Sequence, residues 1–148
     1  MIYCSIDIET TGLNPKIHDI IEFAAVLDNL RDPRPLLELP KFHTYIRKDN
    51  YVGDPYALSM HANIFRKIAN PSSEDSVMLI SALPYAFQNW LSRNNYPYDD
   101  KKKKFLVNVA GKNAAGFDLP FLNEKVKSWE EVPPVEAATH TMAAMLNA

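Results

Sequence analysis

The stretch from Ile2 to Thr10 constrains this chain most, because apolar and polar residues alternate along it and two acids fall at its end. Side chains of a strand alternate between its two faces, so Asp7 and Glu9 point the same way. The residues expected on the opposite, buried face are Ile2, Cys4, Ile6 and Ile8. Thr10-Thr11-Gly12 then predicts a turn. Two carboxylates this close repel unless a cation neutralises them, and a divalent ion bound by oxygen ligands is the usual solution. The alternative is an exposed strand end with two solvated acids.

Length, charge and cysteine content narrow the class of protein. The 148 residues and 47% hydrophobic content predict one domain, residues 1–148, with a real core. A formal net charge of -2 gives no global attraction to nucleic acid, so any polyanion must be held locally. Cys4 is the only cysteine and lies in the first apolar run, which predicts a core thiol and a reducing, cytoplasmic location. No apolar run approaches the ~20 residues of a membrane span, so we expect no membrane partner.

Two further strands follow the first. Residues Ile20 to Leu27 are apolar through most of their length, which is typical of a strand covered on both faces. Residues Phe42 to Ile46 alternate cleanly and predict a third strand. The short links between the three favour an antiparallel arrangement. His43 is expected to be an exposed or cross-strand histidine without a functional role.

Two helices are predicted in the middle of the chain. From Pro55 the apolar residues take a helical period, which stops at Asn70. The buried face of this helix would hold Met60, Ile64 and Ile68. Ser81 is the expected N-cap of a second helix that runs to about Asn94. Its buried stripe would be Leu83, Phe87, Trp90 and Leu91. The lysines at 101–104 predict a solvated turn, with a contact to phosphate groups as the alternative.

A third carboxylate follows the next predicted strand, Phe105 to Ala110. Glycine and alanine residues after that strand allow the backbone to approach another group closely. The helix that comes next begins near Asp118, so we expect this acid at the N-terminal end of that helix, after the end of the strand. The segment from Glu136 to Ala148 predicts a terminal helix that bears His140.

Two motifs, DIETTGL at residues 7–13 and NAAGFDLPFL at residues 113–122, resemble in order and context the first two motifs of the DEDD exonucleases. The resemblance is to the DnaQ-like, histidine-type branch of this ribonuclease-H-like superfamily, and it covers the chain from Met1 to about Trp129. It implies an α/β fold: a mixed five-stranded sheet flanked by helices, whose last strand this chain could lack or replace. The first three strands would be antiparallel and the fourth parallel to the first, with the acids at the strand ends.

The resemblance implies a metal-dependent 3′-to-5′ exonuclease. Such an enzyme hydrolyses phosphodiester bonds at single-stranded DNA or RNA 3′ ends and releases nucleoside 5′-monophosphates. Two Mg²⁺ or Mn²⁺ ions ~3.5–4 Å apart would stabilise charge on the attacking and leaving oxygens, and carboxylates are the ligands such ions prefer. On this mapping Asp7 bridges both ions, Glu9 binds the ion holding the attacking water, and Asp118 serves the other.

The same resemblance implies a set of substrate contacts. The residues expected against the 3′-terminal nucleotide are Thr10, Thr11, Gly12 and Leu13, with the Leu13 side chain under the base. The helix bearing Met60 and His61 would line the substrate groove, although an ordinary amphipathic helix with a surface histidine is an equal alternative. Asn113 would either face the site or tie down its own loop.

The chain departs from the family pattern near its end. His140 resembles the histidine of the third motif, which acts as a general base. Five positions later stands Met145, where the family has an aspartate, and only a short loop separates His140 from the Asp118 helix. The sequence could be truncated or internally incomplete. Otherwise Glu136 or Glu130 could replace the aspartate, or the domain could be catalytically impaired and bind nucleic acid or protein without cutting.

Overall fold

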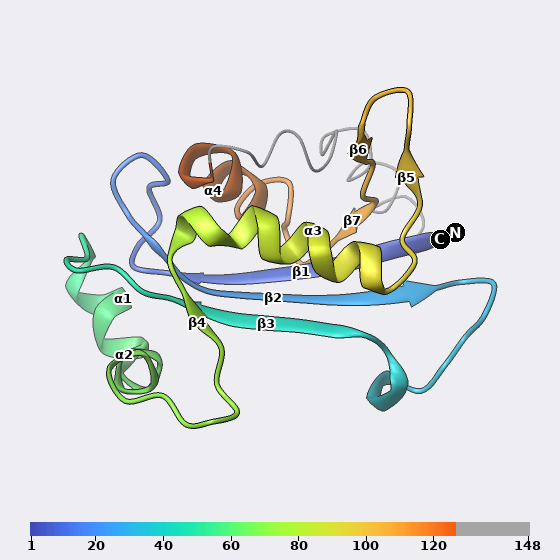
Figure 1. The fold of residues 1–148 in the computed structure, drawn as a ribbon. Helices are drawn as coiled ribbons and strands as arrows, with labels where there is room; N and C mark the ends of the chain where they lie inside the picture. The colour runs from blue at the N-terminus through green and yellow to red at the C-terminus, as the bar shows by residue number, and fades with distance from the viewer. Residues whose placement is uncertain (127–148) are drawn as a thin grey trace.

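The computed structural model describes residues 1–126 and shows a mixed five-stranded sheet in the order β4-β3-β2-β1-β7 (Figure 1). Its strands are β1 (Ile2–Thr10), β2 (Ile20–Asn29), β3 (Lys41–Ile46), β4 (Val77–Met78) and β7 (Val109–Ala110). Strands β1, β2 and β3 are antiparallel neighbours, β7 is parallel to β1, and β4 is parallel to β3. The predicted α/β class, with its mixed sheet and strand directions, is confirmed. The short β4 at the edge was not predicted.

Helices lie on both sides of this sheet. The helical segments are η1 (Leu36–Glu38), α1 (Pro55–Met60), α2 (Ala62–Ala69), η2 (Ile80–Ala82), α3 (Leu83–Arg93) and α4 (Asp118–Lys125). Helix α3 runs along one face, and α1 and α2 lie at the end of the sheet where β1 finishes (Figure 1). Among residues 1–126, no helix has the length and apolar character needed to cross a membrane.

The core forms between one face of the sheet and helices α3 and α4. Alternation along β1 places Cys4, Ile6 and Ile8 in this core, each no more than 3% exposed, as predicted. Burial raises the pKa of the Cys4 thiol, which suits an inert core residue. The face of β1 that carries Asp7 is therefore left for polar groups.

An aromatic cluster fastens α3 to the sheet. Phe23 and Phe42 of the sheet pack against Phe87 and Trp90 of α3, with ring centroids 5.4–5.8 Å apart. Such contacts add to the free energy gained by burying each large side chain, about 1.5–3 kcal/mol. The predicted stripe of α3, which is Leu83, Phe87, Trp90 and Leu91, is buried.

The helix predicted from Pro55 to Asn70 is in fact two helices. His61 has φ -102° and ψ 21°, so its backbone leaves the helical region and ends α1 before α2 begins. Met60, predicted on the buried face, is consequently 60% exposed. Ser81 was also wrongly predicted as an N-cap: it lies inside η2, and Ala82 occupies the cap position ahead of Pro84 in the first turn of α3.

The single strand predicted from Phe105 to Ala110 is divided between two sheets. Its beginning, β6 (Lys104–Phe105), pairs with β5 (Tyr98–Asp99) in a separate hairpin, and only its end, β7, joins β1. The Tyr96 hydroxyl donates to the Leu106 carbonyl at 3.1 Å and accepts the Asn108 N–H at 3.0 Å. These two bonds satisfy the Leu106 carbonyl and the Asn108 N–H, which a continuous ladder would otherwise pair.

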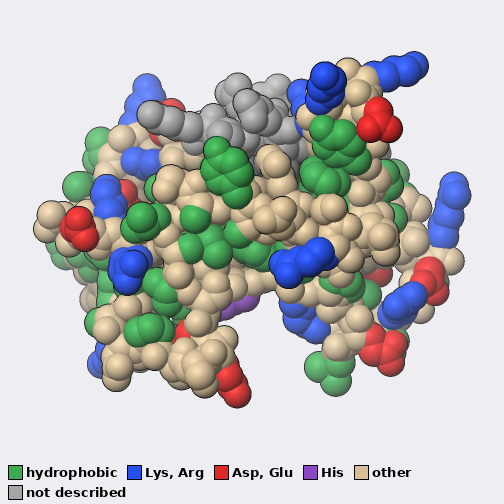
Figure 2. Space-filling view, viewed as in Figure 1, with side chains coloured by type: hydrophobic (Ala, Val, Ile, Leu, Met, Phe, Trp, Pro, Cys, Tyr) green, Lys and Arg blue, Asp and Glu red, His purple; other side chains and the backbone are tan. Residues whose placement is uncertain are grey.

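The surface carries charge in scattered form. On the face shown in Figure 2, Lys and Arg side chains are spread around the periphery instead of forming one field. A nucleic acid on this face would meet local contacts and no broad positive potential.

Candidate functional site

The end of β1 brings two acids onto the open face of the sheet, as the sequence predicted. Asp7 is exposed, and Glu9 lies directly opposite Glu22 of β2 in the antiparallel ladder. Partial burial raises the pKa of Glu9, and the charges of Asp7 and Glu22 raise it further, against an opposing effect of His61. Like charges opposite one another in a sheet are unfavourable, so this strand end stores electrostatic repulsion.

Asp118 reaches the same strand from the first turn of α4. Its side chain is buried, and its Oδ1 accepts a hydrogen bond from the Ile8 N–H at 2.9 Å. Strand β7 pairs with β1 only as far as Ala110 opposite Ser5. The Asp118 carboxylate therefore satisfies a backbone donor of β1 that lies beyond the end of its parallel neighbour.

The three predicted ligands lie within electrostatic range of one another. The pKa of Asp118 is raised to about 6, chiefly by burial; the Ile8 hydrogen bond opposes the shift, and the charges of Asp7 and Glu9 add to it. Across residues 1–126, however, no three His, Cys, Asp or Glu side chains stand close enough together to hold a metal ion. The three acids therefore lie in one region without forming a preassembled metal-binding site.

The chemistry of these side chains fits a hard divalent cation. All three offer carboxylate oxygens, which Mg²⁺ and Mn²⁺ prefer over the nitrogen and sulfur ligands of softer ions. In the part of the chain that the structure describes, no Lys or Arg forms an ion pair with Asp7, Glu9 or Asp118. A cation bound here would therefore relieve repulsion that no Lys or Arg of the described residues compensates, and His61 is the neighbour that lowers the pKa of Glu9.

A groove of about 830 Å³ lies beside Glu9. Its lining comes from the turn after β1, from α1 with the residues just before and after it, and from Phe117, and we call the first two parts its walls. The lining residues are Glu9, Thr10, Gly12, Leu13, Asn14, Pro15, His18, Asp54, Tyr56, Ala57, Met60, His61 and Phe117. Among them, Leu13, Tyr56 and Met60 are 83%, 73% and 60% exposed. Large apolar side chains held open to solvent beside a carboxylate are typical of a ligand-binding groove.

Most of the predicted substrate contacts line this groove. Those that do are Thr10, Gly12, Leu13, Met60 and His61. Thr11 does not, because its side chain is fully buried beneath the turn. Asn113 is exposed and also lies outside the groove lining; its backbone carbonyl accepts the N–H groups of Gly116 and Phe117 at 3.1 and 2.9 Å. These bonds involve the backbone of Asn113, so the role of its side chain stays a prediction.

His61 meets one of the predicted metal ligands. The break between α1 and α2 places its Nε2 3.4 Å from Oε2 of Glu9, and its side chain is 14% exposed. This contact joins the wall formed by α1 to the acids at the end of β1.

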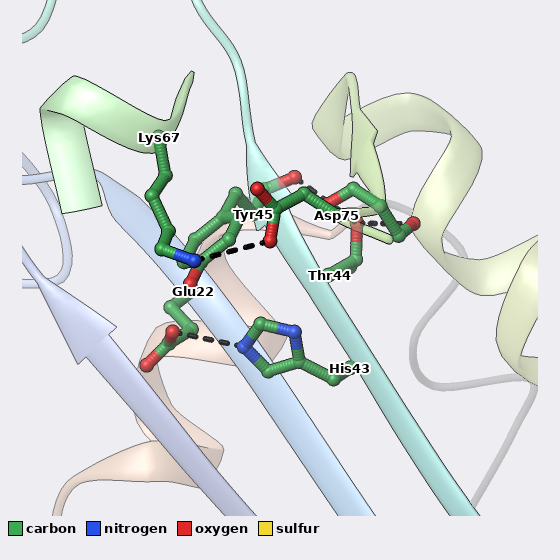
Figure 3. Close-up of polar contacts among 7 residues, drawn as sticks. Glu22, His43, Thr44, Tyr45, Lys67 and Asp75 are labelled. Atoms are coloured by element: carbon green, nitrogen blue, oxygen red, sulfur yellow. Dashed lines mark hydrogen bonds and ion pairs between the residues drawn. The ribbon is translucent and has the colours of Figure 1, made fainter. Parts of the chain in front are cut away.

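Sequence reasoning missed several residues of the groove. Tyr56 and Phe117 line the groove, yet nothing in the spacing of the sequence tells which side of a short helix or loop will face it. His43, predicted to be an exposed or cross-strand histidine, is exposed, and its Nε2 lies 2.9 Å from Oε2 of Glu22 on the neighbouring strand (Figure 3). Since Glu22 is the cross-strand neighbour of Glu9, polar side chains continue from the acids across the sheet.

The remaining predicted residues fall outside the described part of the chain. The general base His140 is one of them, as are Met145 and the replacement acids Glu130 and Glu136. The roles assigned to them stay predictions.

Comparison with known proteins identifies the family. The RNase_T exonuclease family model matches residues 4–130. No curated protein matches the chain. Among solved structures, product-bound exonuclease I superimposes with a TM-score of 0.57 at 14% identity, covering 95% of this chain and 28% of that one.

Two further structures show the same fold. The metal-free complex of E. coli ExoI with single-stranded DNA gives a TM-score of 0.56 at 17% identity, covering 93% of this chain and 25% of that one. Cell-death related nuclease 4 (CRN-4) gives 0.53 at 14% identity, covering 82% and 39%. This chain thus spans well under half the length of each of these proteins. The family model extends over both carboxylate motifs and most of the sequence, and the chain therefore belongs to the RNase_T exonuclease family of the DEDD superfamily.

Proposed function

We propose that this domain is a metal-dependent 3′-to-5′ exonuclease that acts on single-stranded DNA or RNA and releases nucleoside 5′-monophosphates. One observation carries the proposal: Asp7, Glu9 and Asp118 influence one another electrostatically, and Glu9 lines a groove with exposed apolar side chains. Acids alone would fit many cation sites, and an apolar groove alone would fit many ligands. Together they suit a polyanion whose end carries a flat base.

Each element of the site has a role in this proposal. Asp7, Glu9 and Asp118 would hold two divalent cations, which when bound stabilise negative charge on the attacking and leaving oxygens. Exposed Leu13 and Met60 would contact the terminal base across the groove. His140 would take a proton from the attacking water.

The relatives support a nucleic-acid partner. Exonuclease I has been solved with its product and with single-stranded DNA, and those ligands belong to that protein. The groove beside Glu9 gives this chain a place for a similar strand end. The choice between DNA and RNA depends on contacts around the terminal ribose.

The test is digestion of a 5′-labelled single-stranded oligonucleotide with Mg²⁺ or Mn²⁺. We expect a ladder that shortens one nucleotide at a time, with a nucleoside 5′-monophosphate as product. Asp7→Ala should reduce the rate on the order of 100-fold or more, since metal ions supply several kcal/mol of transition-state stabilisation. Asp32→Asn is the control, because Asp32 is an exposed acid paired with Arg34 away from the groove. No shortening, or shortening that Asp7→Ala leaves unchanged, contradicts the proposal.

A second candidate is a catalytically impaired domain that binds nucleic acid or a protein partner. Two observations favour it: Met145 stands where the family has an aspartate, and residues 1–126 contain no preassembled group of three ligands. Calorimetry with Mn²⁺ distinguishes the two candidates. Two coupled binding events that Asp118→Asn weakens support the enzyme, and one weak event or none supports the binding domain.

A further inference from the structure

Thr11 is a junction for three separate segments. Its N–H donates to the Asp19 carbonyl at 2.9 Å, and its carbonyl accepts the Asp54 N–H at 2.7 Å. Its hydroxyl accepts the Asp19 N–H at 2.8 Å and donates to the Val52 carbonyl. A side chain that is fully buried and satisfied in this way fixes the positions of its partners.

Asp19 completes the junction with its carboxylate. The residue is 7% exposed; Oδ1 lies 2.8 Å from Nζ of Lys48, and Oδ2 accepts the Val52 N–H at 2.9 Å. A buried carboxylate is tolerated only when its oxygens are paired, so these two bonds are strongly favoured over solvent-separated arrangements.

The junction lies at the base of both groove walls. On one side Thr11 belongs to the turn whose neighbours Thr10, Gly12 and Leu13 line the groove. On the other side Asp54 accepts the Tyr56 N–H at 2.9 Å and caps α1, which carries the opposite wall. Neither Thr11 nor Asp19 lines the groove, so any effect on it would pass through the residues that they hold.

We propose that Asp19, together with Thr11 and Lys48, is a positioning residue that sets the separation of the two groove walls. Through α1 it keeps His61 against Glu9 and holds Met60 in the lining of the groove that Leu13 shares. This inference rests on the proposed function, because the separation matters for a strand end bound between the walls. It assigns a role to an ion pair between a buried carboxylate and a half-exposed lysine, neither of which lines the groove.

The first test compares two ion pairs of nearly the same exposure. In Lys48–Asp19 the side chains are 53% and 10% exposed, and in Lys67–Asp75, drawn in Figure 3, they are 52% and 13% exposed. Asp19→Asn and Lys48→Met should raise KM for a single-stranded oligonucleotide about tenfold and leave kcat within about twofold, because substrate positioning is lost and the acids remain. Asp75→Asn and Lys67→Met are the controls and should change neither constant. Equal effects from both pairs, or no change of KM, overturn the inference.

The hydroxyl of Thr11 gives a second comparison. Thr11→Ser keeps both bonds of the hydroxyl and should retain the wild-type KM, whereas Thr11→Val has the same shape without them and should behave like Asp19→Asn. If Thr11→Val retains the wild-type KM, the junction does not control the groove.

Amide hydrogen exchange tests the same inference without any activity. In Asp19→Asn and Lys48→Met, exchange should increase at least about tenfold in residues 10–14 and 52–61 and stay unchanged in α3. In Asp75→Asn any increase should be confined to residues near Ser72 and Lys67, its partners. Unchanged exchange at 10–14 and 52–61 overturns the positioning role even in an active enzyme. Increased exchange in a chain that cuts no oligonucleotide retains the role and rejects the proposed function.

Discussion

Asp118 combines two functions in one side chain. It accepts the Ile8 N–H, which anchors α4 to β1, and it faces the charges of Asp7 and Glu9. Burial and these neighbours raise its pKa to about 6 from an ordinary value of 3.8. The folded protein therefore binds this proton more tightly than the unfolded chain does.

The free energy of unfolding of the metal-free protein should accordingly depend on pH. The contribution of Asp118 is fully present below about pH 4 and is lost as pH rises to about 6, a change of about 3 kcal/mol at most. Asp118→Asn keeps an oxygen for Ile8 but does not ionise, so it should remove this decline. Urea unfolding with a chelator from pH 4 to 8 measures the difference. Parallel curves for the two proteins would show that the raised pKa is absent.

At the scale of single residues, the local sequence pattern predicted which face of a strand a residue lies on better than it predicted what that residue contacts. Alternation along one strand was enough to put Asp7 and Glu9 on one face and Cys4 in the core. The burial of Thr11 depends on Asp19 and on a loop some forty residues away, contacts that no local pattern contains.

At the scale of elements, the turn after β1 depends on close packing at Gly12. A Cβ added there would lie 2.4 Å from Nδ1 of His18, the nitrogen that accepts the Asn14 N–H at 2.9 Å. Any side chain at this position must displace the histidine ring and so disrupt the wall of the groove.

We therefore expect Gly12→Ala to lower the free energy of unfolding by about 1–3 kcal/mol, the usual cost of an added methyl group in a tightly packed place. Adding His18→Ala should restore part of this stability, because it removes the atoms that clash. Thermal unfolding of the two single variants and the double variant gives the coupling between the sites. If the two effects simply add, the predicted clash is absent.

The sequence predicted the boundaries of an element correctly only where hydrophobic periodicity alone determines them. The aromatic and aliphatic stripe of α3 emerged as predicted. The break at His61 and the division of residues 105–110 did not, because each is set by tertiary contacts: His61 lies against Glu9, and Tyr96 satisfies the backbone between β6 and β7. Hydrophobic periodicity contains no information on either contact.

At the scale of the whole molecule, one apolar layer supports the site. The cluster of Phe23, Phe42, Phe87 and Trp90 joins α3 to β2 and β3, next to the strand that carries the acids. The strand order was predictable from the family motifs, and the position of the edge strand β4 was not, because a two-residue strand leaves too short a pattern.

Phe87→Ala should lower the free energy of unfolding by about 3–5 kcal/mol, since it removes a fully buried ring and leaves a cavity. Tyr85→Ala on the same helix is the matched control: that side chain is 66% exposed, and the change should stay within about 0.5 kcal/mol. Chemical denaturation followed by circular dichroism compares them. Similar losses for both would mean that α3 is not held by its inner face.

The hydrogen bond from the Ile8 N–H to Asp118 affects how family members that have lost catalytic activity can be recognised from their sequences. A lineage that abandons catalysis still needs an oxygen at position 118 to satisfy a buried amide, so Asp or Asn there says little about activity. Asp7 is exposed, and its carboxylate makes no hydrogen bond or ion pair within residues 1–126, so the fold of that region places no demand on this side chain. Retention of an acid at position 7 is the more informative marker of a working enzyme.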